Sequence, residues 1–449
     1  MKRLMQYVFL FFCAAVFNLA HAQIPDTTKK WKIGDCFQYA AEHNIQTSTL
    51  RLSEQSVLQD LSAARAVKIP GLSASASNTF TNANNNASGD GNLVNQLTSS
   101  GTYSLNSSIV LWNDHYINNT IRQRELLALS AKLSVQQSLN NITLSITRSF
   151  LDILLAKENL GYISDLVSTS EARVKQGQML YDKGSIAKKD LLQLQAQLAS
   201  DKYLLVQTQN AVRQNILTLK QILQLPADTA FDIEPAPLVE VPAVLPPLAD
   251  VRQKALQDFP EIKIGAMGVN IAALDIAKAK AGFKPVLAAN GALGTGYNSV
   301  ITNSVSPKSG YFTQTGNNFY QRLGLTLSVP IFSNRINKTN VEKANIAYKE
   351  AGLNLQNDQL ILSQAVEQAY LDALNAQQAY DAANQQLLAA TESYRIVNEQ
   401  FRLGSVNTYD LLQQRNQYVQ AVQAFTQAKY SAVLQQKIYE FYMGNPVTL

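Results

Sequence analysis

The side chains that could support metal or nucleophilic chemistry are few and isolated. The 449-residue chain has three histidines, and His43 and His115 have no partner at metal-ligand spacing. No phosphate-binding glycine loop and no nucleophile elbow is present. Cys36 lies in an apolar helical register, which predicts a buried core position. The sequence therefore predicts no metal, no cofactor and no enzymatic activity.

Two acidic residues are placed alike, each six positions after a glycine. Residues 181–193 read YDKGSIAKKDLLQ and residues 401–413 read FRLGSVNTYDLLQ, so Asp190 and Asp410 correspond at an offset of 220. A carboxylate at the start of a helix complements the helix dipole, which is a purely structural explanation for each residue. Any further role depends on where the surrounding elements place them.

The same offset relates residues along much of the chain, which indicates an internal duplication. It aligns Leu105, Ile109, Leu111, Trp112 and Ile121 with Leu325, Val329, Ile331, Phe332 and Val341. Between the copies, residues 226–247 contain six of the 13 prolines, which predicts an extended connector. We therefore expect a first repeat at 23–225, a linker at 226–248 and a second repeat at 249–449.

Residues 1–22 have the organisation of a secretory signal peptide. Lys2 and Arg3 precede an apolar run that ends at Phe17, and residues 20–22 form a small-x-small cleavage site. The run is shorter than the about 20 residues that a transmembrane helix needs. A membrane location would therefore have to use strands or amphipathic contacts.

Each repeat contains two segments of apolar–polar alternation, strict in three of the four and looser and Gly-rich in 286–297, which predicts strands with one apolar and one wet face. They are residues 71–81 and 102–112 in the first repeat and residues 286–297 and 319–331 in the second. Arg322 is the only charged residue within them, and long polar loops join each pair. This pattern is typical of outer-membrane β-barrels, with the edge of a soluble β-sandwich as the alternative.

Helical periodicity fills the rest of each repeat. Helices are expected at 36–68 and 249–282, each ended by a proline. Segments 112–184 and 332–404 contain no proline, and each is long enough for a helix of about 100 Å. Return helices are expected at 185–224 and 405–443. Each turn between a long helix and its return helix lies near Gly184 or Gly404.

The composition favours long hydrated helices over compact domains. Charged residues are 16% of the chain, against about 25% in ordinary soluble proteins, and Asn plus Gln make up about one residue in six. The net charge of +5 is too small and scattered for nucleic-acid binding. The sequence thus predicts a mainly α-helical protomer with a membrane β-barrel part. Because four strands cannot close a barrel in lipid, further copies must complete it, and the pattern alone does not select a dimer, trimer or tetramer.

Taken in order, these features resemble the TolC family of outer-membrane efflux proteins. The resemblance covers nearly the whole mature chain. It rests on the signal segment, the duplicated halves, the helices that end at Pro70 and Pro285, the strand pairs and the two Gly-x-x-x-x-x-Asp turns. It implies a homotrimer with a 12-stranded β-barrel in the outer membrane of a Gram-negative cell and a periplasmic tunnel of coiled-coil helices. It also implies a passive exit duct that works with a periplasmic adaptor and an inner-membrane pump, with outer-membrane lipid around the barrel.

The resemblance further implies roles for individual residues at the two helix–turn–helix tips. The tips would form the tunnel entrance and meet the adaptor, at Lys183, Gly184, Ser185, Ile186, Arg402, Leu403, Gly404, Ser405 and Val406. Asp190 and Asp410 match acidic residues that narrow the family's entrance, where a ring of Asp410 would attract cations. Gln413 occupies the position where family members often carry a second Asp. Members also have a basic residue near the tip that helps to hold the closed state, and in this sequence Arg402 or Lys183 would have to take that role.

Trp112 and Phe332 end the strands that lead into the long helices. We expect them to be aromatic residues at the membrane interface, with packing inside the strand-to-helix bend as the structural alternative. Two other functions share parts of this pattern. One is the outer-membrane duct of a type I protein-secretion system, and the other is a secreted coiled-coil structural or adhesive protein.

Overall fold

The computed structural model describes residues 30–86, 93–226, 228–235, 245–302 and 309–447. The predicted signal peptide lies outside these residues, as do residues 227 and 236–244 of the proline-rich linker. Contacts divide the chain into two compact units, each built from segments of both repeats. Unit 1 comprises Met1–Ile45, Leu139–Val251 and Val366–Leu449, and unit 2 comprises Gln46–Ser138 and Arg252–Ala365.

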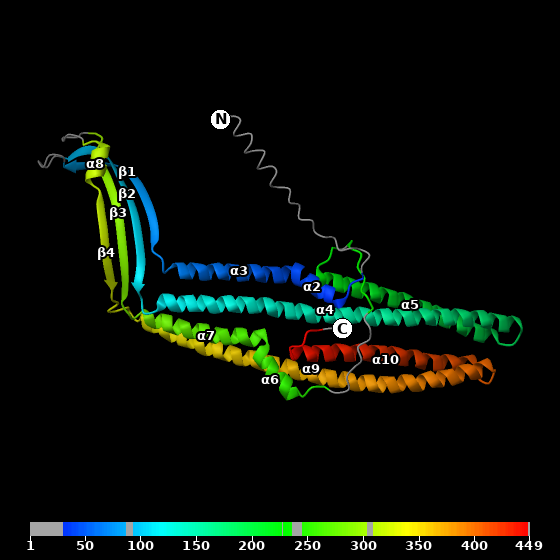
Figure 1. Ribbon diagram of the computed structural model, residues 1–449. Helices are drawn as coiled ribbons and strands as arrows, with labels where there is room; N and C mark the ends of the chain where they lie inside the picture. The colour runs from blue at the N-terminus through cyan, green and yellow to red at the C-terminus, as the bar shows by residue number, and fades with distance from the viewer. Residues whose placement is uncertain (1–29, 87–92, 227, 236–244, 303–308, 448–449) are drawn as a thin grey trace, which may run out of the picture. The chain divides into compact units, whose positions relative to one another are not determined.

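The described elements follow one series in each half of the chain (Figure 1). They are α2 (Ile33–His43), α3 (Ile45–Ala66), β1 (Gly71–Asn86), β2 (Leu93–Trp112), α4 (Tyr116–Asp182), α5 (Lys188–Leu223), α6 (Leu248–Asp258), α7 (Pro260–Ala281), β3 (Val286–Val300), α8 (Tyr311–Asn317), β4 (Tyr320–Ser328), α9 (Ile336–Arg402) and α10 (Thr408–Tyr442). The long helices α4 and α9 have 67 residues each. Among the described residues, no helix has both the length and the apolar character needed to cross a bilayer.

The first helix of each half is divided in two, so the expectation of continuous helices at 36–68 and 249–282 was wrong. In the first half, Asn44 separates α2 from α3 in an extended conformation with ψ of 124°. In the second half, Phe259 is extended and Pro260 begins α7. Proline disfavours a helical conformation in the residue before it and suits the first position of a new helix, which explains the second break.

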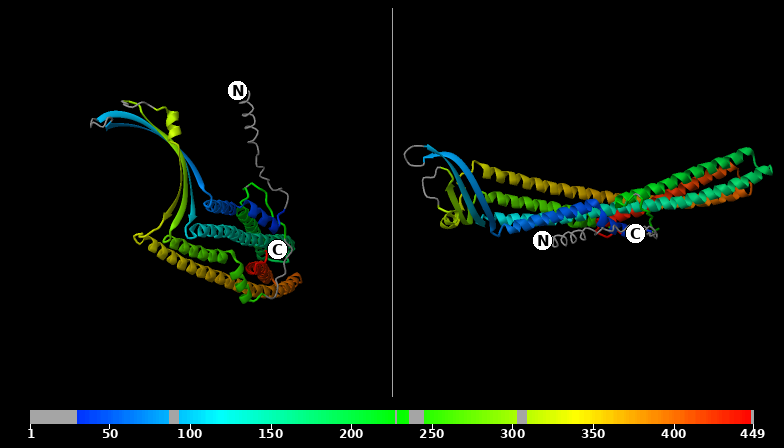
Figure 2. Two further views of the ribbon diagram at one scale, coloured as in Figure 1. Left: turned by 60° about the vertical axis from the view of Figure 1, so that its left-hand side comes forward. Right: turned by 90° about the horizontal axis from the view of Figure 1, so that it is seen from above.

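In unit 2 the four strands form one antiparallel sheet in the order β1-β2-β3-β4, and β1 and β4 are its edges. Strands β1 and β2 are longer than the predicted segments 71–81 and 102–112. Their pairing continues through a polar stretch, where the side chain of Asn95 donates to that of Asn84 at 3.1 Å. The last strand is shorter than predicted and ends at Ser328, since Pro330 cannot donate a hydrogen bond to the ladder. The sheet is curved, as Figure 2 shows.

The two faces of this sheet differ sharply in chemistry. Residues directly opposite each other in an antiparallel pair share a face, so Leu105 and Leu293 lie together, as do Leu287 and Leu327. We call this the aliphatic face, and its members are Leu72, Ala74, Ala76, Leu105, Ile109, Leu287, Ala289, Leu293, Leu323, Leu325 and Leu327. Leu323 is 89% exposed, so the described residues leave this leucine largely uncovered.

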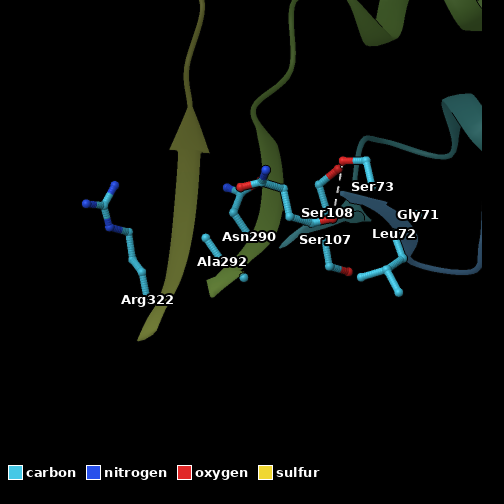
Figure 3. Close-up of a pocket in the computed structure, with 10 residues that line it drawn as sticks. Gly71, Leu72, Ser73, Ser107, Ser108, Asn290, Ala292 and Arg322 are labelled. Atoms are coloured by element: carbon cyan, nitrogen blue, oxygen red, sulfur yellow. Dashed lines mark hydrogen bonds between the residues drawn. The ribbon is translucent and has the colours of Figure 1, made fainter. Parts of the chain in front are cut away.

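The opposite face carries hydroxyl and amide groups that bond across the strands. We call it the hydroxyl face, and its members include Ser73, Ser75, Ser77, Thr102, Ser104, Asn106, Asn290 and Thr326. Hydrogen bonds join the hydroxyls of Ser75 and Ser104 at 2.8 Å and those of Ser77 and Thr102 at 2.7 Å. One row, Ser73, Asn106, Ala292 and Arg322, crosses all four strands (Figure 3). Within the described strands Arg322 is the only charged residue.

The helices of unit 2 pair with the first part of α4. Buried Thr47 on α3 contacts Ser138 through their hydroxyls at 3.3 Å. On the other side, Gln123 donates to both carboxylate oxygens of Asp275 on α7 at 3.0 Å and accepts from Lys278 at 2.7 Å. Polar pairs of this kind hold the helices against one another where the apolar stripe is narrow.

Unit 1 contains the main apolar core and the two helical hairpins. Its core gathers Trp31, Ile33, Cys36, Ala40, Ile146, Phe150, Leu151, Ile153, Leu154, Leu219, Leu223, Leu225, Ile233, Tyr430 and Val433. The chain near Trp31 pairs in parallel with Ile233 of the linker, since the Trp31 N–H donates to Asp232 and the Glu234 N–H donates back to Trp31. The linker's first part therefore adds a short β-bridge to this core.

Candidate functional site: the hairpin turns and the ends of the sheet

The two helical hairpins end in turns of the same construction. Gly184 and Gly404 have φ of 73° and 77°, a left-handed conformation in which glycine avoids the strain that a Cβ would cause. The Ser185 N–H donates to the Leu180 carbonyl and the Gly184 N–H to that of Tyr181, both at 2.8 Å. The second hairpin repeats these two bonds from Ser405 and Gly404. Each long helix thus ends in a Schellman motif, which fixes where the chain reverses.

The predicted tip residues are largely exposed. Lys183, Gly184, Ser185, Leu403, Gly404 and Ser405 are open to solvent, while Ile186 and Val406 are partly buried. Leu403 has 68% of its surface exposed, although it is a large aliphatic side chain. An exposed leucine on a rigid turn is suited to contact with another protein.

The acidic residues lie in the first turns of the return helices. Asp190 is in the first turn of α5 and is partly buried, while Asp410 is in the first turn of α10 and is exposed. The cap of α10 is Asn407, whose Oδ1 accepts from the Asp410 N–H at 3.0 Å. Gln413 lies one turn further along and is also exposed. Within the described part of the chain, no hydrogen bond or ion pair connects Asp190 with Asp410.

Among the described residues, no hydrogen bond or ion pair joins Arg402 or Lys183 to the other hairpin. Arg402 forms an ion pair with Glu399 on its own helix, with 2.5 Å between Nη2 and Oε1. The hydrogen bond from Arg402 lowers the pKa of the Glu399 carboxyl. Both side chains are well exposed, so the pair contributes little to stability. The hypothesis that Arg402 latches the hairpins has no support in this arrangement.

The strongest polar link between the hairpins was not recognised from the sequence. Arg415 on α10 donates to Asp201 on α5 at 2.5 Å and to the Ser170 hydroxyl on α4 at 3.1 Å. The Ser170 hydroxyl donates to Asp201 at 2.6 Å, and all three residues are buried. The sequence did contain an indication of this contact. Asp201 interrupts the row of leucines on α5 between Leu198 and Leu205, at a position that faces a neighbouring helix.

A second set of contacts joins the hairpins nearer the turns. Arg173 on α4 donates to Asn398 at 2.5 Å and to the Tyr394 hydroxyl at 3.2 Å, both on α9. The ring of Tyr394 stacks on that of Tyr418, with centroids 5.2 Å apart and planes at 12°. Tyr418 also meets Tyr162 edge-on at 6.4 Å. Aromatic and polar groups together therefore fix α4, α9 and α10 in one arrangement.

Trp112 and Phe332 lie where strand passes into helix, and both bends have the same backbone. Asp114 and His115 have φ of 48° and 64°, and their counterparts Asn334 and Arg335 have φ of 46° and 66°. Trp112 is 43% exposed and Phe332 is 84% exposed. The described residues thus leave Phe332 largely uncovered, and the membrane-interface role of both aromatic residues stays a prediction.

The isolated histidine and cysteine have structural surroundings. His43 stacks on Tyr39 with ring centroids 4.2 Å apart. Cys36 is fully buried, and burial raises the pKa of its thiol to about 12. Across the described residues, no group of three or more potential ligands is placed to hold a metal ion.

Comparison of the fold with solved structures finds several outer-membrane channels. The chain resembles the CmeC outer membrane channel of Campylobacter jejuni with a TM-score of 0.77 and 17% identity, over 92% of this chain and 85% of that one. It resembles the outer membrane protein VceC of Vibrio cholerae with a TM-score of 0.75 and 14% identity, over 92% and 96%. It resembles the MtrE outer membrane channel of Neisseria gonorrhoeae with a TM-score of 0.72 and 17% identity, over 92% of this chain and 88% of that one.

Sequence comparison gives a narrower result. Among curated proteins no sequence matches the chain. The model of the outer membrane efflux protein family matches residues 251–440, which include α7, the β3–β4 pair and the α9–α10 hairpin. The family consists of channels and not enzymes, which agrees with the scarcity of reactive side chains. With the shared fold, this match confirms the predicted resemblance to outer-membrane efflux proteins: residues 251–440 match the model of that family, and 92% of the chain shares the fold of outer-membrane channels.

Proposed function

We propose that this efflux channel is the exit duct of a tripartite system, passively conducting substrates received from a periplasmic adaptor and an inner-membrane pump. In this proposal three copies form a 12-stranded β-barrel in the outer membrane and a helical tunnel in the periplasm. The observation that carries the proposal is the curved four-stranded sheet, which has an aliphatic face, a hydroxyl face and two edges.

If the sheet lies in lipid, other copies of the chain would have to close it. Backbone groups at an open edge cannot be left without hydrogen bonds in lipid, so β1 of one copy must pair with β4 of the next. The aliphatic face then meets lipid and the hydroxyl face lines a wet lumen, where each copy contributes Arg322. Exposed leucines such as Leu323 and Leu325 are unfavourable in water but suited to a lipid surface.

The family match over residues 251–440 and the fold support the trimer over other closed assemblies, because four strands from each of three copies give the 12 strands that the resemblance implies. The hairpin tips around Gly184 and Gly404 would then lie at the tunnel entrance and meet the adaptor. Exposed Leu403 and Ser405 offer it one apolar and one polar contact on the turn at Gly404. Asp410 and Asp190 would form the pore gate, where their negative charges would attract cations and repel anions.

Disulfide trapping between the sheet edges tests the assembly. In a Cys36→Ala background, Ala74→Cys on β1 is combined in turn with Leu323→Cys, Leu325→Cys or Leu327→Cys on β4. Oxidation in membranes should give covalent dimers and trimers and nothing larger, because a closed ring has no free edge. Each single-cysteine variant is the matched control and should give no trimer.

The opposite outcomes are equally clear. A ladder of products that continues beyond the trimer would indicate open edge-to-edge association and defeat the duct. A soluble monomer that no pair cross-links would place the chain outside the membrane and overturn the proposed function altogether.

A further inference from the structure

The segment between β3 and β4 contains a short helix, α8, that is bound tightly to the sheet. The Thr295 hydroxyl donates to the Thr315 carbonyl of α8 at 2.5 Å. The N–H of Asn298 donates to the Gln314 side chain at 2.9 Å, and Asn318 donates to the Gly296 carbonyl at 2.7 Å. These three bonds join the C-terminal half of α8 to β3, so α8 is attached to the sheet and is not a loose loop.

The face on which α8 sits follows from the strand register. Thr295 follows Leu293 by two residues, so both lie on the aliphatic face, and Thr295 is opposite Tyr103. Tyr297, two residues further, packs edge-on against Tyr311 of α8 with ring centroids 4.8 Å apart. The helix therefore covers the aliphatic face near the end of β3 that is far from α7 (Figure 1).

At this level the aliphatic face changes its chemistry from aliphatic to aromatic and polar. The Tyr297 hydroxyl donates to Asn78 at 3.1 Å and contacts the Ser99 hydroxyl at 3.3 Å, while its ring covers Gly101. Aromatic rings with a polar end prefer the boundary between hydrocarbon and water. Leu287, at the other end of the face, is eight residues from Thr295, or about 26 Å along the strand. That length is close to the apolar band of about 25 Å in outer-membrane barrels.

The two ends of this band are therefore both marked by aromatic residues. Trp112 is paired with Leu287 at one end, and Tyr297 with α8 marks the other. On α8, Phe312 is 86% exposed, although it is the most apolar side chain of the helix and no charged residue lies in α8 to draw it into water. An exposed phenylalanine on a rigid, uncharged helix needs an amphipathic medium to cover it.

We propose that α8 is an interfacial helix that anchors the barrel in the membrane. It lies on the lipid-facing side of the barrel, with Phe312 inserted among the lipids of the outer leaflet at headgroup depth. The occupant of this surface is membrane lipid, and the helix does not close the lumen. The inference rests on the proposed membrane placement of the sheet, and it adds a position and a partner for a segment that the duct itself does not require.

Spin labels at three cysteines test the position of α8 in proteoliposomes of the full chain. The background is Cys36→Ala, and the labelled variants are Phe312→Cys on α8, Leu325→Cys on the aliphatic face and Ser73→Cys on the hydroxyl face. Relaxation is measured with oxygen, with a water-soluble nickel complex and with a nickel-chelating lipid whose metal lies at the headgroups. Phe312 is 86% exposed, so labelling it removes only its edge-on contact with the neighbouring Tyr311.

We expect the headgroup nickel to relax the label at Phe312 several-fold more than either of the other labels. The label at Leu325 should respond to oxygen and not to the soluble nickel complex, and the label at Ser73 should respond in the opposite way. If Leu325 behaves as a lipid site while Phe312 responds like Ser73, α8 lies in water and the inference is overturned with the duct intact. If Leu325 itself responds only to soluble nickel, the sheet is not in lipid and both proposals fail.

Discussion

The guanidinium of Arg415 lies 2.5 Å from the carboxylate of Asp201, and the two side chains are 2% and 4% exposed. Asp201 also accepts hydrogen bonds from Ser170 at 2.6 Å and from Gln197 at 2.9 Å. The pair joins α10 to α5 and, through Ser170, to α4, so one ionic contact ties the two hairpins together. Such a buried pair is costly to form and very costly to break on one side.

The first prediction concerns the loss of one partner from this pair. Arg415→Met leaves Asp201 buried without its counter-charge and should lower the free energy of unfolding by about 3–5 kcal/mol. Asp201→Leu should do the same by leaving the guanidinium unpaired. Thermal and denaturant unfolding of the purified protein in detergent measure the effect.

The double variant and an exposed pair supply the controls for this prediction. Arg415→Met combined with Asp201→Leu should cost less than either single change, because no charge is left unpaired. Arg395→Ala, which removes an exposed ion pair with Glu392, should change stability by less than about 1 kcal/mol. Additive losses in the double variant would show that the pair is not coupled.

The second prediction concerns the glycine turns. Gly404→Ala places a Cβ on a residue with φ of 77° and should destabilise the hairpin by about 1–2 kcal/mol, with the same result for Gly184→Ala. Gly161→Ala is the matched control, because Gly161 lies within α4 with open space around its Cβ position. That control should stabilise by about 0.5–1 kcal/mol. Equal melting temperatures for both variants would rule out a conformational requirement at the turns.

The parts of the fold that the sequence predicts well are those with a long, regular pattern. The 67-residue helices α4 and α9 and the left-handed glycines between hairpin helices follow from periodicity and from Gly-Ser turns. The break at Pro260 was also readable, since proline favours the first position of a helix. The break at Asn44 had no such signal, because it depends on a tertiary hydrogen bond from Ile45 to Gln224.

The contacts that join the hairpins are harder to predict for a physical reason. Asp201 and Arg415 are 214 residues apart, and nothing local requires either charge to be buried. The interrupted leucine seam shows only that Asp201 faces a neighbour, not which residue neutralises it. Similarly, α8 has a polar sequence, and its helical form depends on bonds to β3 that only the folded sheet provides.

The third prediction concerns the proposed entrance. Asp410 is exposed in the first turn of α10, and its loss removes one negative charge from each copy at the tunnel mouth. Asp410→Ala should raise conductance or weaken block by multivalent cations added from the periplasmic side. Gln413→Asp adds a charge one turn away and should strengthen that block. Single-channel recording in planar bilayers measures both, and unchanged current with unchanged block would remove Asp410 from the gate.

The fourth prediction concerns pH and the buried thiol of Cys36. Its pKa is raised from an ordinary 9.0 to about 12 because burial disfavours the thiolate. In the unfolded chain the thiol loses its proton above pH 9, whereas in the folded chain it stays protonated until about pH 12. The unfolded state therefore binds fewer protons in this window, and stability falls as pH rises through it.

Cys36→Ala separates this effect from other alkaline transitions. Between pH 9 and pH 11 the native protein should lose on the order of 1 kcal/mol more per pH unit than the variant, because only the native protein carries the raised pKa. Below pH 9 the two should show the same pH dependence, whatever the constant offset due to the lost side chain. Denaturant unfolding across this range, with iodoacetamide labelling to confirm that the folded thiol is unreactive, makes the comparison. Parallel curves above pH 9 would mean that the thiol ionises equally in both states.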